Sequence, residues 1–352
     1  MGLNDLLKIA IERGGSDVFI IPGSPVMVKV QGNLQTLNDQ RMLPADTKAL
    51  IGEAYALAGR QQEALSEREG DDDFSFSIRD LSRFRCNVYQ QRGTLAATCR
   101  VVAFGLPDPA KYHIPPLVMK LTNLRSGMIL VTGPAGSGKS TTLACMVDRI
   151  NTERDGHIVT IEDPIEYLHS HKKSLVSQRE VPNDTPTFAR ALRAALRQAP
   201  DVIMLGEMRD EETISTAITA AETGHLLLSS LHTIGAAKTV DRIIDSFPAE
   251  QQNQVRVQLS MVLKAVVSQR LVPRLGGGLI PVFEVMTVNP AVQNMVREGR
   301  THQIDNTIYA GNGADMLSMD SELLRLYKEK QIDRQTAISY AVNPDTLSKK
   351  LL

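Results

Sequence analysis

One glycine-rich run constrains this chain more than any other feature. It matches the phosphate-binding pattern G-x-x-x-x-G-K-[ST] and comprises Gly133, Pro134, Ala135, Gly136, Ser137, Gly138, Lys139 and Ser140. The apolar residues 128–132 predict a buried strand before the run, and residues 141–148 predict a helix after it. This strand, loop and helix order indicates a phosphate-binding loop and disfavours the alternative, a chance glycine-rich turn.

The chemistry of phosphate binding gives each part of this loop a role. Backbone N–H groups and the positive end of the following helix would cradle phosphate oxygens. Lys139 would reach the β- and γ-phosphates, and the Ser140 hydroxyl would bind Mg²⁺. We therefore expect ATP and Mg²⁺ as ligands, with Thr141 completing the nucleotide-binding set.

Length and charge narrow the class of protein. A chain of 352 residues exceeds one ordinary core, so we expect two or three domains. The formal net charge of −1 does not favour nucleic acid as a partner. The absence of Trp and an aromatic content of 4% disfavour a protein that binds single strands by base stacking.

The cysteines and the N-terminus indicate the compartment. Cys86, Cys99 and Cys145 are widely spaced and contain no C-x-x-C pair, which disfavours a disulfide framework and a structural zinc site. No signal peptide and no stretch of 18 apolar residues is found. We therefore expect a cytoplasmic protein whose contact with a membrane is peripheral, at its inner face.

Residues 1–102 predict a small, mostly antiparallel α+β domain. A short helix ends near residue 13, an antiparallel meander covers residues 18–37, and residues 45–69 predict two helices. Residues 74–78 and 83–89 alternate as strands, so that Phe84 and Cys86 share one face and Arg83 and Arg85 the other. Arg100, on the next strand, also points away from the apolar face.

Four prolines mark residues 103–116 as a linker. From residue 117, strands alternate with helices, which is typical of a mostly parallel sheet covered on both faces. We expect an α/β core over residues 117–275 and a mostly helical C-terminal region over residues 276–352. The predicted strands of the core are 128–132, 158–162, 202–206, 226–231 and 266–272. The predicted helices lie near 139–150, 186–198, 210–223, 235–245 and 248–264.

Carboxylates follow two of the predicted core strands. Glu207 comes after residues 202–206, where the acid that supports Mg²⁺ is expected. Glu162 ends the predicted strand 158–162, Asp163 and Glu166 follow it, and like charges so close suggest a shared cation. We expect Glu162 and Asp163 around Mg²⁺ and Glu166 as the base that positions water, whereas the plain alternative is a solvated acidic loop.

Two histidines bracket the predicted strand 226–231. His225 precedes it and His232 follows it, and this separation is too large for one zinc ion. We interpret both as candidate γ-phosphate sensors. The alternative is that each is a hydrogen-bonded structural residue.

Several of these segments together resemble one family. The run LRQAPDVIMLGEMRD at residues 196–210 resembles the signature of the bacterial secretion ATPase superfamily, the motors of type II secretion and type IV pili. TIEDPIE at residues 160–166 looks like its Asp box, and residues 223–233 look like its His box. The resemblance implies a RecA-like core with an N-terminal PAS-like domain.

Within this superfamily the chain is most similar to the ATPases of pilus retraction. AVQNMVRE at residues 291–298 resembles their motif A-I-R-N-L-I-R-E, from which it departs at Val292, Gln293, Met295 and Val296. Assembly and secretion ATPases usually carry a tetracysteine zinc module and a longer N-terminal extension, which are not found here. A pilus assembly or type II secretion ATPase, an accessory PilU-like ATPase and, more remotely, a nucleic-acid translocase stay open as alternatives.

The resemblance also implies an assembly. Family members form homohexameric rings, in which arginines of the N-terminal domain act near the γ-phosphate, and the matching residues are Arg85 and Arg100. The implied partners are a PilC-like platform protein of the inner membrane and possibly PilU-like or PilB-like ATPases, with no nucleic acid.

Overall fold

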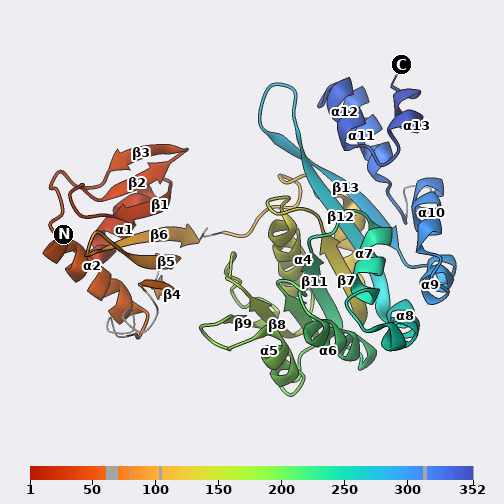
Figure 1. Cartoon of the computed structure of the whole chain (residues 1–352), viewed down its shortest axis with the longest axis horizontal. Coiled ribbons are helices and arrows are strands. Elements are labelled where there is room, and N and C mark those ends of the chain that lie inside the picture. Colours follow the sequence, from red (N-terminus) through yellow and green to blue (C-terminus); the bar gives the residue numbers. More distant parts are fainter. Residues whose placement is uncertain (61–69, 80, 103–104, 312–314, 352) are drawn as a thin grey trace. The chain divides into compact units, whose positions relative to one another are not determined.

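The computed structural model describes residues 1–60, 70–79, 81–102, 105–311 and 315–351, which form two compact units (Figure 1). The first comprises Met1–Gly105 with the segment Glu166–Leu168, and the second comprises Leu106–Ile165 and His169–Leu352. Each is built around a sheet of its own.

The first unit is a six-stranded antiparallel sheet with strand order β3-β2-β1-β6-β5-β4. Apolar side chains of both helices and one sheet face form its core. The predicted meander and the alternation of Phe84 with Arg85 are thereby confirmed. Of the two helices predicted over residues 45–69, the first is confirmed, and the second falls on residues 61–69, outside the described part. The elements are α1 (Leu3–Glu12), β1 (Gly15–Ile20), β2 (Met27–Val30), β3 (Asn33–Thr36), α2 (Pro44–Leu57), β4 (Asp71–Ile78), β5 (Ser82–Gln91) and β6 (Thr94–Val102).

The second unit contains a seven-stranded sheet with order β13-β12-β7-β11-β10-β8-β9. Its strands are β7 (Gly127–Thr132), β8 (Gly156–Glu162), β9 (Ser174–Glu180), β10 (Val202–Leu205), β11 (Leu226–Leu231), β12 (Leu263–Pro273) and β13 (Leu279–Thr287). Its first helices are α3 (Pro116–Lys120), the 3-10 turn η2 (Leu121–Asn123), α4 (Lys139–Glu153), α5 (Phe188–Ala195), α6 (Glu211–Glu222), α7 (Ala236–Ile244) and α8 (Ala249–Val262). Its last are α9 (Pro290–Arg297), η3 (Thr301–Gln303), α10 (Ile304–Ala310), α11 (Met319–Lys328), α12 (Arg334–Tyr340) and α13 (Pro344–Ser348).

The sheet is parallel except for its edge strand β13, which pairs antiparallel with β12. The five predicted core strands and the five predicted helices are confirmed, as is the mostly parallel α/β class. The edge strand β9 was not predicted from the sequence. Its burial alternates and it contains few apolar residues, so it lacks the continuous apolar run of an inner strand.

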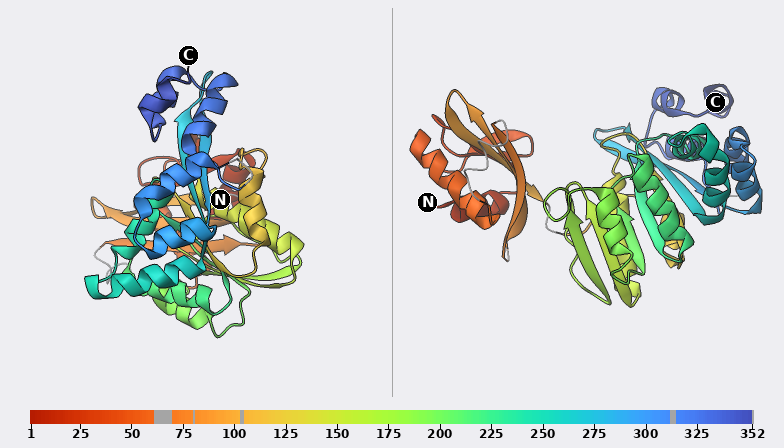
Figure 2. Two further views of the ribbon diagram at one scale, coloured as in Figure 1. Left: turned by 90° about the vertical axis from the view of Figure 1, so that its right-hand side faces the viewer. Right: turned by 60° about the horizontal axis from the view of Figure 1, so that its bottom comes forward.

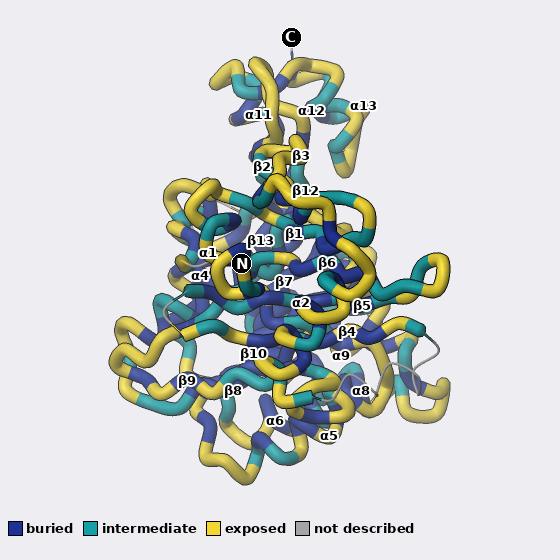
Figure 3. Tube along the Cα trace, turned by 90° about the vertical axis from the view of Figure 1, so that its left-hand side faces the viewer, coloured by how far each residue is buried: buried dark blue, intermediate teal, exposed yellow. Residues whose placement is uncertain are grey.

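Helices lie on both faces of this sheet (Figure 2). In β7, Met128 and Leu130 belong to a core shared with α5 to α10, whereas Ile129 and Val131 belong to a core shared with α3 and α4. All six residues of β7 are therefore buried (Figure 3). This burial explains the continuous apolar run that precedes the glycine-rich loop.

The C-terminal helices form two groups. Helices α9 and α10 add Val292, Val296, Ile304 and Ile308 to the core on the α5 to α8 face of the sheet. Helices α11, α12 and α13 form a smaller core with the outer parts of β12 and β13. Among the described residues, no helix combines the length and apolarity that crossing a bilayer requires.

Candidate active site

The glycine-rich loop connects β7 to α4, and its backbone depends on glycine at two positions. Gly133 has a φ of 146°, and a Cβ there would lie 2.2 Å from the carbonyl oxygen of Gln269. Gly138 has a φ of 89° and directly precedes the first residue of α4. Because both values fall where side chains are strained, the loop keeps this path only with glycine. Helix α4 thus points its N-terminal amides toward the loop.

Lys139 folds back over this loop. Its Nζ donates hydrogen bonds of 3.0 Å to the carbonyl oxygens of both Gly133 and Pro134. The residue is buried at 9% exposure. The ammonium is therefore held at the mouth of the loop, where phosphate oxygens could replace the carbonyls.

Three strand ends bring the predicted polar residues together. The loop follows β7, His232 follows β11, and Glu207 lies two residues beyond β10, and these strands are parallel neighbours. Nδ1 of His232 lies 3.5 Å from Nζ of Lys139, and Nε2 lies 3.4 Å from Oε2 of Glu207. The sheet thus gathers Lys139, His232 and Glu207 into one cluster at its carboxyl edge.

Glu207 also pairs with Arg209 through its other carboxylate oxygen. A hydrogen bond to this carboxylate raises the pKa of the Arg209 guanidinium above its ordinary value. Oε2 of Glu207 is buried and has no hydrogen-bond partner among the described residues, although Nε2 of His232 lies 3.4 Å away. This oxygen can therefore still accept a hydrogen bond, for example from a metal-bound water.

The residues at this edge fit Mg²⁺ bound together with a nucleotide. The Ser140 side chain lies on the first turn of α4 and is half-buried, and Ser137 Oγ is buried without a hydrogen-bond partner among the described residues. In the described part of the chain, no group of three or more His, Cys, Asp or Glu could hold a metal alone. Mg²⁺ usually takes one or two protein ligands and completes its shell with phosphate and water. This donor set suits that arrangement.

The acidic residues after β8 have different surroundings. Glu162 is buried, and its Oε1 accepts hydrogen bonds from Thr160 Oγ1 at 2.6 Å and from Gln178 Nε2 at 3.2 Å. Asp163 and Glu166 are exposed. The roles of Glu162 and Asp163 at Mg²⁺ and of Glu166 as the water-positioning base stay predictions.

The structure does not bring His225 to the loop. Its backbone carbonyl accepts a hydrogen bond from Gly127, the first residue of β7, whereas the loop follows the last residue of β7. Its Nδ1 lies 2.9 Å from the carbonyl oxygen of Ala220. Because β7 and β11 are parallel, the two ends of β11 lie at opposite edges of the sheet. His225 therefore does not join the cluster of Lys139, His232 and Glu207 in this chain, and its role as a γ-phosphate sensor stays a prediction.

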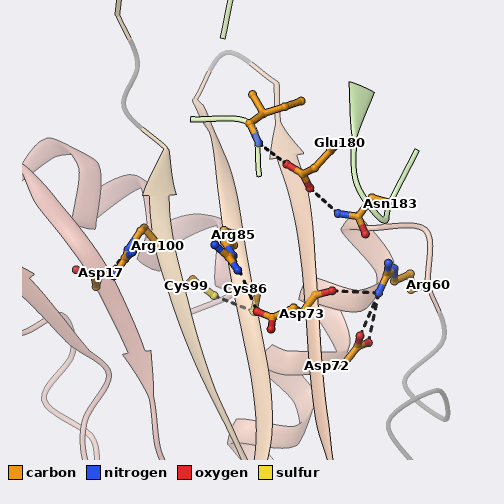
Figure 4. A network of polar contacts seen from close by, with 11 residues as sticks. Asp17, Arg60, Asp72, Asp73, Arg85, Cys86, Cys99, Arg100, Glu180 and Asn183 are labelled. Atoms are coloured by element: carbon orange, nitrogen blue, oxygen red, sulfur yellow. Dashed lines mark hydrogen bonds and ion pairs between the residues drawn. The ribbon is translucent and has the colours of Figure 1, made fainter. Parts of the chain in front are cut away.

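In the first unit, both candidate arginines have acidic neighbours (Figure 4). Arg100 on β6 pairs with Asp17 on β1 at 2.8 Å, and its side chain is 70% exposed. Arg85 on β5 lies 4.0 Å from Asp73 on β4. These pairs hold the guanidinium groups on the face that is not covered by α1 and α2. Their action near a γ-phosphate stays a prediction.

Sequence reasoning missed Gln269 on β12. This side chain is 2% exposed, accepts a hydrogen bond from Thr142 Oγ1 at 2.7 Å, and donates to the carbonyl oxygen of Ser137. One amide therefore fastens both the loop and the first turn of α4 to the sheet. The available signal was a polar residue within the apolar run of β12, which indicates a buried hydrogen-bonding role.

Comparisons with known proteins agree with this arrangement. A family model described as Type II/IV secretion system protein matches residues 111–346. The type IV pilus retractation ATPase PilT of Pseudomonas aeruginosa is 40% identical over 345 residues, which are 98% of this chain and 99% of that protein. A twitching motility protein of Neisseria gonorrhoeae is 41% identical, covering 92% of this chain and 86% of the relative. A crystal structure of the pilus retraction motor PilT with bound ADP has a TM-score of 0.89 at 43% identity and covers 99% of both chains.

Proposed function

The chain belongs to the Type II/IV secretion system protein family, and from this premise we propose that it is an ATP-hydrolysing motor that powers type IV pilus retraction. The observation that carries the proposal is the cluster of Lys139, His232 and Glu207 at the end of the phosphate-binding loop. The near full-length similarity to PilT narrows the ATPase to a pilus motor.

The residues of the cluster, together with Ser140 and Glu166, would have different roles in phosphoryl transfer. Lys139 would leave the carbonyls of Gly133 and Pro134 to hold the β- and γ-phosphates. Mg²⁺, when bound, would neutralise phosphate charge, with Ser140 and Glu207 as its nearest protein groups. His232 would report the γ-phosphate, because its imidazole touches both the lysine and the acid. Glu166 would position the attacking water.

The pattern of the C-terminal motif favours retraction. Of the residues that depart from A-I-R-N-L-I-R-E, Val292 and Val296 are buried, and Met295 packs partly buried against the same core. Gln293 is the remaining departure and is half-buried. The matching residues are all exposed, and they are Ala291, Asn294, Arg297 and Glu298. The exposed surface that a partner could contact therefore keeps the motif, while three of the four departures fall on positions that pack against the core.

The finer parts of the proposal concern assembly. The chain would form a homohexamer in which Arg85 and Arg100 act near the γ-phosphate, and the PAS-like domain (1–102) would move relative to the core (117–275) about the linker (103–116). The C-terminal region (276–352) would pass this motion to a platform protein at the inner face of the membrane. Similarity to pilus motors supports these parts.

A deletion strain tests the proposal. We expect cells lacking the chain to carry surplus surface pili and to lose twitching, with rescue by wild type and none by K139A. Bald cells would instead indicate an assembly motor, and unchanged pili would contradict both assignments. Steady-state ATPase activity of the purified protein separates an active motor from a catalytically weak accessory subunit. Salt-dependent DNA binding would support the nucleic-acid translocase, which the net charge of −1 disfavours.

A further inference from the structure

A buried carboxylate on β13 lies where two helices begin. Glu284 is 4% exposed, and its Oε1 accepts a hydrogen bond of 3.0 Å from the amide of Ala236, the first residue of α7. The backbone of Met319, the first residue of α11, also acts on this carboxyl group and lowers its pKa, against the larger effect of burial. The positive ends of two helices therefore converge on one negative group.

Cross-strand register connects this carboxylate to the phosphate-binding loop. Glu284 pairs with Ser268 on β12, and Ser268 pairs with Thr132, the last residue of β7. Ser268 Oγ accepts a hydrogen bond of 2.9 Å from the amide of Gly235, which precedes Ala236. The amides of Gly235 and Ala236 at the start of α7 are thus held by Ser268 and Glu284. These two residues are neighbours in a cross-strand row that ends at Thr132, beside the phosphate-binding loop.

The start of α7 is joined to His232 by a short link. Residues 233–235 are all that separate them, and Thr233 Oγ1 lies 2.7 Å from Thr239 Oγ1 on α7. Gly235 has a φ of 91° in the left-handed region that favours glycine, which restricts the path of the link. The position of His232 and the first turn of α7 are therefore joined through few freely rotating bonds.

Hydrogen bonds connect the start of α11 to β13 and to the segment that follows α12. Val285 and Leu317 exchange backbone hydrogen bonds of 2.8 and 2.9 Å beside the start of α11. Asp320, the second residue of α11, accepts hydrogen bonds from the amides of Val342 and Asn343 at 2.7 and 3.0 Å. The segment that follows α12 is thereby tied to the same turn of α11.

We infer that Glu284 is a positioning residue that couples the site at His232 to the helices α11 to α13, an inference that rests on the nucleotide-binding function proposed above. A carboxylate suits this task because both of its oxygens accept and neither must donate. The isosteric amide of glutamine has one acceptor and one donor group, so it can still accept from Ala236 but loses the second acceptor and the negative charge that both helix starts favour. E284Q therefore preserves the volume of the side chain and removes the bridge.

Hydrogen exchange of the full-length protein tests the inference, with and without Mg²⁺ and a nonhydrolysable ATP analogue. In wild type we expect nucleotide to slow exchange in residues 232–240 and in residues 319–328. E284Q should keep the first response and lose at least about half of the second, while its affinity for the analogue changes less than about tenfold, the equivalent of one hydrogen bond. E329Q is the control, because Glu329 is an exposed ion-pair partner of Arg325 at the other end of α11. It should respond like wild type.

S268A is the second variant if E284Q fails to fold, because it removes the acceptor of Gly235 and leaves the carboxylate in place. It should weaken the response of residues 319–328 in the same direction. A full response of these residues in E284Q overturns the inference, as does a wild-type response confined to residues 232–240. If wild type does not bind the analogue at all, the proposed function is overturned, and the inference with it. This outcome can be told apart from the others because neither residues 232–240 nor residues 319–328 then respond.

Discussion

Nε2 of His232 lies 3.4 Å from Oε2 of Glu207, although the two residues follow different strands. The other ring nitrogen of His232 faces the ammonium of Lys139 at 3.5 Å. One imidazole thus lies between the ammonium of Lys139 and the carboxylate of Glu207, which supports the proposal that His232 senses the γ-phosphate.

Substitution of this pair should impair turnover. We expect E207Q and H232A each to lower kcat by about 100-fold or more, since each removes a group that orients charge at the reacting phosphate. Because the two act as a unit, the double variant should lose less than the product of the single losses. H225A is the matched comparison, because His225 precedes β11 whereas His232 follows it, and it should lower kcat less than H232A does. Multiplicative losses in steady-state assays would contradict a shared role.

Glu166 should separate binding from hydrolysis. E166Q removes the base but keeps the shape of the side chain, so we expect a loss of at least about 100-fold in kcat with little change in nucleotide affinity. Glu153, an exposed residue at the end of α4, provides the control E153Q. An undiminished ATPase rate in E166Q would refute the assigned role.

Substitution of Gln269 should lower the free energy of unfolding and raise KM for ATP. Q269L leaves the Ser137 carbonyl and the Thr142 hydroxyl without their partner, which should cost about 1 to 3 kcal/mol of unfolding free energy. Since the loop loses its support, KM for ATP should rise more than kcat falls. Q258L, which changes a glutamine on α8 bonded to Glu222, is the control. Equal KM values for Q269L and wild type would argue against positioning of the loop.

Glu284 should make stability depend on pH. Burial, chiefly, with added repulsion from Asp305 and Asp320, raises the pKa of this carboxyl from 4.5 to about 7. The folded state therefore holds the proton more tightly than the unfolded state, so the contribution is complete below pH 4.5 and is lost as pH rises through about 7. Urea unfolding across this range should show wild type losing about 3 kcal/mol relative to E284Q.

The comparison with E284Q is needed because a second group acts in the opposite direction. Burial lowers the pKa of His169 from 6.5 to about 4, so its contribution to stability is present above pH 6.5 and is lost as pH falls. Wild type and E284Q both keep His169, so its contribution cancels in the difference between their free energies of unfolding. A difference that is independent of pH would contradict the shifted pKa of Glu284.

The exposed arginine of the first unit should affect catalysis without affecting stability. The pair of Arg100 with Asp17 is largely solvated on the arginine side, and such pairs contribute at most about 1 kcal/mol. If Arg100 stabilises the γ-phosphate within a ring, R100A should lower kcat by about 1,000-fold and leave the unfolding free energy nearly unchanged. R13A, which removes another surface arginine of this unit, is the control. A kcat of R100A equal to that of wild type would contradict a catalytic role for Arg100 and indicate an ordinary surface charge.

The sequence by itself determined the loop, the inner strands and the class of fold. These are local properties: the glycine and lysine positions of residues 133–140 define the loop, and strands buried on both faces, such as β7 and β11, are continuous apolar runs. Edge strand β9, with its mixed polar composition, lacked that signal. The ends of strands also indicated Glu207 and His232 as candidates.

Only the tertiary structure decided which of these candidates meet. The strand order places the ends of β7, β11 and β10 side by side, so His232 reaches both Lys139 and Glu207, whereas His225 lies at the far edge. The contacts of Gln269 with the loop and with α4, and of Glu284 with the start of α7, join residues far apart along the chain. Local periodicity states which face of a strand is buried, but the partner across that face depends on register between distant segments, which no short pattern encodes.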